Sequence, residues 1–374
     1  MKILIVDLPL KPFLKSTNLA IHFHKLRVKD IRKETSDCVS IAFEIPAEVE
    51  HDFRFIQGQN ITVKATADAQ ERRSYSICSS PTENELRVAV KKVENGLFST
   101  FANEKLKIGD VLEVMPPTGT FFTGLNPAKK SEYVFFAAGS GITPVISIIK
   151  TILTTENKSL ITLMYGNKNL ASVIFKDQLE ALKDKYLQRF SMYNIFSREK
   201  TESDFNYGRI DVSKLNKLSK FVNFNKIDHF FICGPEQMIF TVKDFLKGWG
   251  IESEKIHFEL FTTPTKKHTK IYKSAEETAP SGSDITLKID GRTFEFKLGF
   301  NEETILDAGL AQGADLPFAC KGGVCCTCKA KLVEGEVEME ANYGLENSEV
   351  KEGFILTCQS HPRSQKVIVD YDQA

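Results

Sequence analysis

The sequence predicts a multidomain protein in which an antiparallel β-barrel precedes a doubly wound α/β domain with a parallel sheet, and a cysteine-rich module ends the chain. Three observations support this prediction. Short alternating apolar and polar runs fill the first third, strand and helix patterns alternate in the middle, and five of the eight cysteines lie after residue 319. At about 100–200 residues per domain, a chain of 374 residues is long enough for two or three domains.

The barrel is predicted over residues 23–127 from runs in which side chains alternate with period two, as in half-buried strands. Turn residues separate these runs, a spacing that is typical of an antiparallel barrel. Residues 1–22 match no repeating pattern and are predicted to be an extension. The predicted strands are HKLRVKDI, CVSIAFEI, NITVKAT, RRSYSIC, ELRVAVKKV and DVLEVMPP.

The α/β domain is predicted over residues 128–261, where strand and helix patterns alternate as they do in a parallel, doubly wound sheet. Strands are expected at YVFFAAG, ITLMYGN, FSMYNIFS, HFFICG and KIHFELF, and helices at PVISIIKTIL, SVIFKDQLEALKDKY and 235–248. Residues 262–283 are polar and contain Pro, Gly and Ser, which predicts a linker. In the module from 284 to 374 we expect a hairpin around Asp290-Gly291, a helix at ETILDAGLAQG and a last strand at KVIVDY.

Charge and hydropathy exclude several classes of protein. The chain has 49 basic and 49 acidic residues, so no bulk attraction to nucleic acid or to a membrane is expected. From Asp284 onward there are 9 basic and 16 acidic residues, a net charge of −7, and the preceding part carries +7. No stretch approaches the roughly 18 apolar residues of a membrane span. Asp7, Pro9 and Lys11 interrupt the apolar start too early for a signal peptide, so a cytoplasmic protein with reduced thiols is expected.

The clustered cysteines predict an iron–sulfur site. Their C-x4-C-x2-C spacing, with a fourth cysteine thirty residues later, is the plant-type 2Fe–2S signature. Gly322 and Gly323 would let backbone N–H groups approach the sulfurs. A zinc site or inert thiols are the alternatives, although zinc commonly uses two C-x2-C pairs and one fits here. Cys326 is interpreted as a neighbour that binds no metal and is open to oxidation. The expected ligands are Cys320, Cys325, Cys328 and Cys358.

A flavin site is suggested by two segments of the barrel. The tetrapeptide 73–76, R-S-Y-S, ends a predicted strand, and Gly96-Leu-Phe-Ser99 opens a predicted helix. A helix N-terminus suits a pyrophosphate, and Arg73 can add a bidentate contact to it. Tyr75 can lie against a flat ring, and Ser76 can donate a hydrogen bond to it. Alone, this motif is weak, because arginine and serine at a strand end are commonly surface residues.

Three turns of the α/β domain suggest a nucleotide site. The segment 139–144, G-S-G-I-T-P, joins a strand to a helix, and Pro144 suits the first helical position. The third glycine of the dinucleotide fingerprint is missing, so a plain turn stays open as the alternative. The segments 233–235, C-G-P, and 197–198, S-R, end other parallel strands, where ligands bind in such sheets. Alone, Cys233 is more often a buried small hydrophobe, and Arg198 is equally often a solvated surface residue.

Together, the order R-x-Y-S, G-x-x-S, G-S-G-I-T-P and C-G-P resembles the ferredoxin–NADP reductase superfamily over about 240 residues. The last module resembles a plant-type ferredoxin, and this domain order is that of oxygenase reductases. Within that group, ADLPFACKGGVCCTCKAKL and MEANYGLENSEVKEGFILTCQS are most similar to the phenylacetate-degradation reductases. The resemblance implies an FAD-binding barrel, an NAD(P)-binding α/β domain and a β-grasp ferredoxin domain. Residues 1–20 have no counterpart in it, and Cys326 stands where a small residue is usual.

The resemblance also implies residue roles. Ser76 and Cys233 would act in hydride transfer, Glu259 and Phe261 would form an E-x-F motif whose aromatic ring faces the flavin, and Ser197 with Arg198 would favour NADPH over NADH. The implied FAD contacts are Arg73, Ser74, Tyr75, Ser76, Val90, Lys91, Gly96, Leu97, Phe98 and Ser99. The implied nucleotide contacts are Gly139, Gly141, Thr143, Pro144, Ser197, Arg198, Cys233, Gly234, Pro235 and Met238.

The implied activity is electron transfer from NADPH through FAD and a 2Fe–2S cluster to an oxygenase partner. The first expected partner is a phenylacetyl-CoA epoxidase-type di-iron enzyme. Another oxygenase, a hydroxylase, a P450 or a fatty-acid desaturase is the alternative. A redox-sensing or electron-buffering protein without useful turnover is a different class, against which the intact flavin and nucleotide motifs argue. The acidic last module is expected to dock on a basic patch of the partner.

Overall fold

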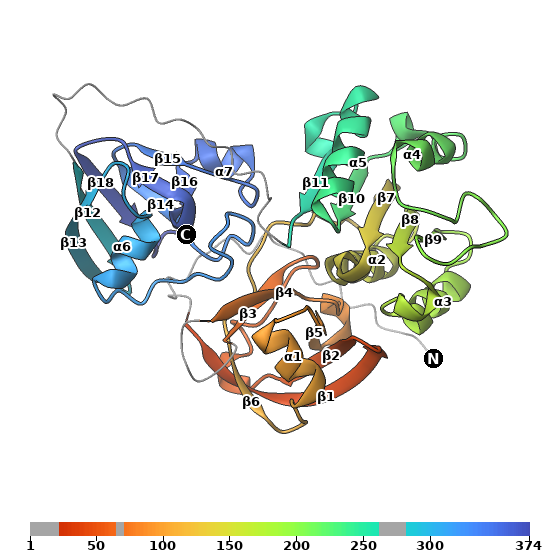
Figure 1. Ribbon diagram of the computed structural model, residues 1–374, viewed down its shortest axis with the longest axis horizontal. Coiled ribbons are helices and arrows are strands. Elements are labelled where there is room, and N and C mark those ends of the chain that lie inside the picture. The colour runs from red at the N-terminus through yellow and green to blue at the C-terminus, as the bar shows by residue number, and fades with distance from the viewer. Residues whose placement is uncertain (1–21, 65–70, 262–281) are drawn as a thin grey trace.

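The computed structural model describes residues 22–64, 71–261 and 282–374, which form three sheet-based units (Figure 1). Almost all of the predicted extension and linker lies outside the described residues. In Figure 1 the barrel lies below, the parallel-sheet unit to the right and the cysteine-rich unit to the left. Short 3-10 turns occur at Ala47–Val49, Pro81–Glu83, Gly139–Gly141, Leu170–Ser172, Phe224–Lys226, Ser253–Lys255 and Thr357–Gln359.

The first unit is a six-stranded antiparallel sheet in the order β4-β3-β6-β1-β2-β5. An isolated bridge between Ile77 and Val88 brings its two ends together, so the sheet curves into a barrel. Alternate side chains of each strand fill its core, as the period-two pattern predicts, and helix α1 (Leu97–Glu104) packs against it. The strands are β1 (His24–Thr35), β2 (Cys38–Glu44), β3 (Asn60–Lys64), β4 (Arg72–Ser76), β5 (Leu86–Lys91) and β6 (Val111–Val114).

The second unit is a five-stranded, all-parallel sheet in the order β11-β10-β7-β8-β9. Helices α2 (Ile142–Thr155) and α3 (Lys176–Lys185) contribute to one apolar cluster, and α4 (Val212–Leu218) and α5 (Glu236–Gly248) to another, so both faces are covered. Burial on both faces explains the nearly continuous apolar strands. The strands are β7 (Glu132–Ala138), β8 (Leu160–Asn167), β9 (Phe190–Phe196), β10 (His229–Cys233) and β11 (Ile256–Glu259).

The third unit has a mixed sheet in the order β13-β12-β18-β14-β16 and a small sheet of β15 and β17. Asp290 and Gly291 both have positive φ angles, 54° and 68°, which confirms the predicted hairpin turn. The elements are β12 (Gly282–Ile289), β13 (Arg292–Gly299), α6 (Ile305–Ala311), β14 (Lys329–Glu334), β15 (Val337–Met339), α7 (Asn347–Lys351), β16 (Phe354–Leu356), β17 (Ser360–Pro362) and β18 (Lys366–Asp370).

Two boundaries in the parallel-sheet unit differ from the sequence prediction. The helix expected over 172–186 begins only at Lys176, because Val173, Ile174 and Phe175 are buried in the core and Phe175 has a left-handed φ of 60°. Pro144 is the third residue of α2 rather than the first, since a 3-10 turn over Gly139–Gly141 leads directly into Ile142. Helices α4 and α7 and strands β14 to β17 were not predicted from the sequence.

Candidate functional site

A cavity of about 350 Å³ lies where the three units meet. Strand β4 lines one side, the end of β11 another, and the cysteine loop a third. The structure thus brings the predicted flavin tetrapeptide, the end of the parallel sheet and two of the predicted cluster ligands to one place. The lining residues are Asn60, Arg72, Arg73, Ser74, Ser76, Glu259, Leu260, Phe261, Ala319, Cys320, Val324 and Cys325.

Three of the four residues of the R-S-Y-S tetrapeptide line this cavity. The side chain of Arg73 is 53% exposed, and its guanidinium pairs with Glu71 at 2.7 Å and donates to the carbonyl of Arg72 at 2.9 Å, so a ligand that binds it would share it with these partners. Tyr75 does not line the cavity. It packs against Phe98 of α1, with ring centroids 5.5 Å apart, and burial raises the pKa of its hydroxyl.

Ser76 links the barrel to the parallel sheet. Its buried hydroxyl donates a 3.1 Å hydrogen bond to the Glu259 carboxylate at the end of β11. Burial raises the pKa of Glu259 to about 8, so this side chain is mostly neutral at pH 7. Cys233 pairs in register with Glu259 on the neighbouring strand, and burial raises the pKa of its thiol well above the ordinary value. Cys233 is therefore a neutral thiol rather than a nucleophilic thiolate.

The two glycine-containing turns of the parallel sheet contact each other. A Cβ atom on Gly141 would lie 2.1 Å from the carbonyl oxygen of Cys233, so only glycine fits there. A Cβ atom on Gly234 would lie 2.7 Å from the methyl group of Met238. The hydroxyl of Thr143 donates to the carbonyl of Ser140 within the first turn. The structure therefore joins the G-S-G-I-T-P and C-G-P motifs at one sheet edge, as predicted for the carboxyl ends of parallel strands.

Several other predicted flavin contacts lie outside the 350 Å³ cavity. Gly96 is the N-cap of α1 without a side-chain cap, and the hydroxyl of Ser99 accepts a hydrogen bond from the N–H of Val93. Val90 is fully buried in the barrel core, and Lys91 faces Asp37 at 3.6 Å.

The predicted nucleotide contacts Ser197 and Arg198 follow β9 and also lie outside the 350 Å³ cavity. Backbone N–H groups of Ser197 and Arg198 donate to the carbonyls of Asn167 and Lys168. The side chain of Arg198 is exposed. Phe261, by contrast, lines the 350 Å³ cavity and is 41% exposed.

The four predicted ligands form a connected group of thiols. Cys320 is within hydrogen-bond reach of Cys325 and Cys358, and Cys358 is within reach of Cys328. The N–H of Gly322 donates to the Cys320 sulfur at 3.3 Å. The other three sulfur atoms are buried, so the group is shielded from water.

This arrangement fits a 2Fe–2S cluster better than a zinc ion. A tetrahedral zinc site places all of its ligands around a single ion. A 2Fe–2S cluster needs only two protein ligands on each iron, because bridging sulfides complete its coordination. The neighbouring pairs Cys320–Cys325 and Cys328–Cys358 match that requirement.

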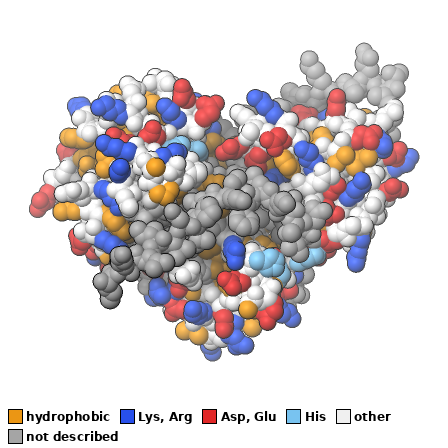
Figure 2. Space-filling model, turned by 180° about the vertical axis from the view of Figure 1, so that it is seen from behind, with side chains coloured by type: hydrophobic (Ala, Val, Ile, Leu, Met, Phe, Trp, Pro, Cys, Tyr) orange, Lys and Arg blue, Asp and Glu red, His pale blue; other side chains and the backbone are white. Residues whose placement is uncertain are grey.

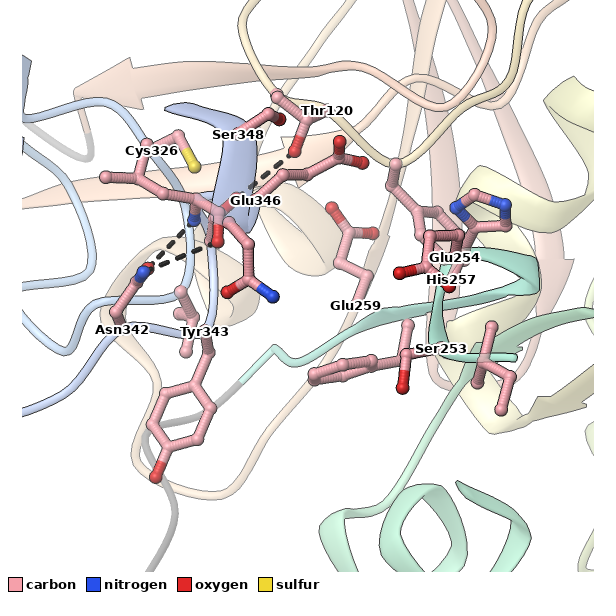
Figure 3. Close-up of a pocket in the computed structure, with 18 of the residues that line it drawn as sticks. Thr120, Ser253, Glu254, His257, Glu259, Cys326, Asn342, Tyr343, Glu346 and Ser348 are labelled. Atoms are coloured by element: carbon pink, nitrogen blue, oxygen red, sulfur yellow. Dashed lines mark hydrogen bonds between the residues drawn. The ribbon is translucent and has the colours of Figure 1, made fainter. Parts of the chain in front are cut away.

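Cys326 lines a second cavity, of about 660 Å³, between β11 and the segment 342–351 (Figure 3). Figure 3 shows it on the opposite side of this cavity from His257 and Glu254. Its φ angle is 57°, and its sulfur lies 2.5 Å from where a Cβ of Gly344 would be. Burial raises the pKa of this thiol well above its usual value, which argues against the expected sensitivity to oxidation.

Arg72, Asn60 and Thr62 are the junction residues that the sequence analysis missed. The adjacent arginines 72 and 73 are plain in the sequence, but the alternation of side chains along β4 leaves Arg72 buried and Arg73 exposed. The contacts of Arg72 come from residues more than 240 positions away, for which a single sequence gives no signal.

Comparison with known families divides the chain into three parts. Residues 25–122 match the oxidoreductase FAD-binding domain, residues 135–244 the oxidoreductase NAD-binding domain, and residues 287–363 the 2Fe-2S iron-sulfur cluster binding domain. The chain therefore belongs to the ferredoxin–NADP reductase-type oxidoreductases that carry FAD-binding, NAD-binding and 2Fe-2S domains. This confirms the predicted fold classes and the predicted class of enzyme.

Full-length relatives place it among the reductase components of oxygenase systems. It is 45% identical to one of the subunits of 1,2-phenylacetyl-CoA epoxidase from Escherichia coli (strain K12), over 94% of this chain and 98% of the relative. It is 30% identical to the ferredoxin reductase component of 3-ketosteroid-9-alpha-monooxygenase from Rhodococcus rhodochrous, over 92% and 96%. The structure of phthalate dioxygenase reductase matches with a TM-score of 0.55 and 24% identity, over 93% and 98% of the chains. Across the described ranges, no helix is long and apolar enough to cross a membrane.

Proposed function

We propose that this protein transfers electrons from NADPH to an oxygenase, and that the oxygenase is a phenylacetyl-CoA epoxidase-type di-iron enzyme. The observation that carries the proposal is the cavity where β4, the end of β11 and the cysteine loop meet. When bound, FAD would accept a hydride, which carries two electrons, and release them singly to the 2Fe–2S cluster. The 45% identity to a subunit of 1,2-phenylacetyl-CoA epoxidase supports this choice of partner.

The residues of β4 and the parallel sheet would position the reactants. Arg73 offers an exposed guanidinium for the FAD pyrophosphate, together with the N-terminus of α1 at Gly96. Ser76 and the mostly neutral Glu259 form a hydrogen-bonded pair beside Cys233, which would hold the nicotinamide ring next to the flavin. Because Ser76 and Cys233 are buried, they would also help to exclude water from the hydride path.

The cysteine loop would hold the cluster with two thiolates per iron. Backbone N–H groups of Gly322 and Gly323 reach the sulfurs of Cys320 and Cys358, and such hydrogen bonds stabilise the thiolates and tune the reduction potential. A side chain at residue 323 would be strained, since its φ is 73° and a Cβ would lie 2.8 Å from the carbonyl oxygen of Ala341.

The preference for NADPH is part of the proposal and rests on Arg198. Its exposed side chain follows β9 at the carboxyl edge of the sheet, where it can pair with a 2′-phosphate. Ser197, beside it, donates its hydroxyl to Asn167, so this turn is held in place before a nucleotide binds.

We assign FAD binding to residues 23–127, nucleotide binding to 128–261 and cluster binding to 284–374, in a cytoplasmic protein. The last domain carries a net charge of −7 and would steer toward a basic patch on the oxygenase. Figure 2 shows charged side chains of both signs mixed over the visible face, so steering would act through the net charge of the domain rather than through a patch there.

The proposal is tested by reconstitution with the oxygenase components of phenylacetyl-CoA epoxidase. Holoprotein, NADPH, oxygen and phenylacetyl-CoA should yield epoxide in amounts that match NADPH consumption, at a rate that falls as salt is added. The matched control replaces the epoxidase by the oxygenase of 3-ketosteroid-9-alpha-monooxygenase with its own substrate. Equal coupling to both oxygenases, or coupling to the control alone, would overturn the assigned partner.

A further inference from the structure

Arg72 joins the barrel to the cysteine-rich unit. Its side chain is 8% exposed and reaches from β4 to residues just before the cysteine loop. One nitrogen, Nη1, donates a 3.0 Å hydrogen bond to the carbonyl of Leu316, and Nη2 lies 3.5 Å from the carboxylate of Asp315. The guanidinium carbon lies 4.1 Å from the ring centroid of Phe318 and 5.0 Å from that of Phe23. The cation is thus held between one aromatic ring from each unit.

The contacts of Arg72 with Leu316 and Phe318 stabilise the junction more than its contact with Asp315 does. The Asp315 side chain is 85% exposed, so solvent screens that ion pair and it adds little. The hydrogen bond to the Leu316 carbonyl and the contact with the buried Phe318 ring are both shielded from water.

A second contact holds the other side of the same loop. The hydroxyl of Thr62 on β3 lies 3.3 Å from the hydroxyl of Thr327, and 3.2 Å from that of Ser74 on β4. Thr327 in turn hydrogen-bonds the sulfur of Cys325. Thr62 and Thr327 are each 1% exposed, so the contact between their hydroxyl groups is closed to solvent.

One contact lies just before the first predicted ligand, and the other lies between two of the ligands. Phe318 is two residues before Cys320, and Thr327 lies between Cys325 and Cys328. Strands β3 and β4, which make these contacts, also line the cavity assigned to the flavin. Any movement of the cysteine loop away from the barrel must therefore break the contacts of Arg72.

We propose that Arg72 is a positioning residue, which docks the cysteine loop on the flavin-bearing strand and so sets the separation across which electrons pass to the cluster. The inference rests on the proposed function, because only an internal relay makes this separation matter. Electron transfer slows steeply with distance, so a loosely docked loop slows cluster reduction without changing hydride transfer. Loss of a charge-assisted hydrogen bond and a cation–π contact should lower the docking equilibrium constant by about tenfold to a hundredfold.

The test compares Arg72→Met and Arg72→Lys with wild-type holoprotein, and uses Arg27→Met as the matched control. Arg27 lies on the same barrel, but its side chain is 61% exposed, and its contacts with Glu44 at 3.7 Å and with the carbonyl of Gly109 at 3.4 Å are exposed to solvent. Docking is measured without turnover, by small-angle X-ray scattering and by hydrogen exchange of segments 60–64 and 313–328 in the oxidised protein. The relay is then measured by anaerobic stopped-flow spectroscopy with NADPH.

For Arg72→Met we expect a larger radius of gyration, faster exchange in both segments, and cluster reduction slowed about tenfold relative to flavin reduction in the same variant. Arg72→Lys keeps the charge and should recover part of each effect, and Arg27→Met should match the wild type. Unchanged scattering, exchange and cluster reduction in Arg72→Met would overturn the proposal, as would equal slowing of flavin and cluster reduction.

A second variant changes the residue that contacts Arg72 from the cysteine-rich unit. Phe318→Leu removes the ring under the guanidinium, and its effect should not add to that of Arg72→Met, because the two residues act through one contact. Full additivity of the two effects on hydrogen exchange would contradict the proposal, and this measurement does not require cluster reduction. If wild-type protein never reduces its cluster, the proposed function fails, whereas the scattering and exchange results still decide whether Arg72 docks the loop.

Discussion

A histidine pair on the parallel sheet should make this domain sensitive to acid. His257 on β11 stacks on Phe231, with centroids 4.6 Å apart, and its Nε2 lies 3.2 Å from Nδ1 of His229. His229 stacks in turn on Tyr133. Burial, with a smaller contribution from His229, lowers the pKa of His257 from 6.5 to about 4. The folded protein therefore keeps this ring neutral at pH values where the unfolded chain protonates it.

The sign and size of the effect follow from this pKa difference. The unfolded state binds more protons between pH 6.5 and about 4. The contribution of His257 to the free energy of unfolding is therefore fully present above pH 6.5 and is lost as the pH falls toward 4. At 1.36 kcal/mol per pKa unit the total loss is about 3 kcal/mol, of which about 1.3 kcal/mol falls between pH 7.5 and 5.5.

The assay is native-state hydrogen exchange of the β10 and β11 amides in wild type and in His257→Phe. Phenylalanine keeps the stack on Phe231 but cannot take up a proton. Between pH 7.5 and 5.5, the opening free energy of the wild type should fall by about 1.3 kcal/mol more than that of the variant. Equal losses in the two proteins would refute this reasoning, whatever the variant does to stability at pH 7.5.

Three further predictions concern the site. Gly141→Ala places a Cβ 2.1 Å from the Cys233 carbonyl oxygen, so the variant should lose NADPH binding in titrations while its visible spectrum still shows flavin and cluster; unchanged binding would argue against contact of these turns. Cys326→Ser should keep full iron content and Cys325→Ser should lose the cluster, as iron and sulfide analysis would show; loss in both would make Cys326 a ligand. Arg198→Ala should raise the KM for NADPH about tenfold and leave that for NADH almost unchanged, since a phosphate–arginine contact is worth about 1.5–3 kcal/mol; equal changes would remove the assignment.

Much of the fold could be predicted because local patterns determine it. Alternation located the barrel strands, and Asp290-Gly291 located a hairpin turn whose two positive φ angles suit Asn, Asp and Gly. The late start of α3 could not be predicted from helical spacing, since the apolar residues before Lys176 fill the core instead of continuing the helix. There tertiary packing overrides local preference.

The site was only partly visible in the sequence. Ser76 and Cys233 were singled out from short motifs, and the structure brings them to one junction with Glu259. Tyr75 was expected beside a ligand, yet it packs on Phe98, and Arg72 was passed over although it is the buried arginine of the pair. The expected contact of Tyr75 with a flavin stays a prediction, whereas the burial of Arg72 depends on Asp315 and Leu316, which are more than 240 positions away in the chain.

The central claim is that one chain carries electrons from NADPH through a flavin to its own iron–sulfur cluster. The most direct test is anaerobic stopped-flow visible spectroscopy of oxidised holoprotein mixed with NADPH, with NADH as the comparison. The account predicts rapid loss of flavin absorbance, followed by loss of the cluster absorbance, and faster reaction with NADPH. Flavin reduction with an unchanged cluster spectrum would contradict it.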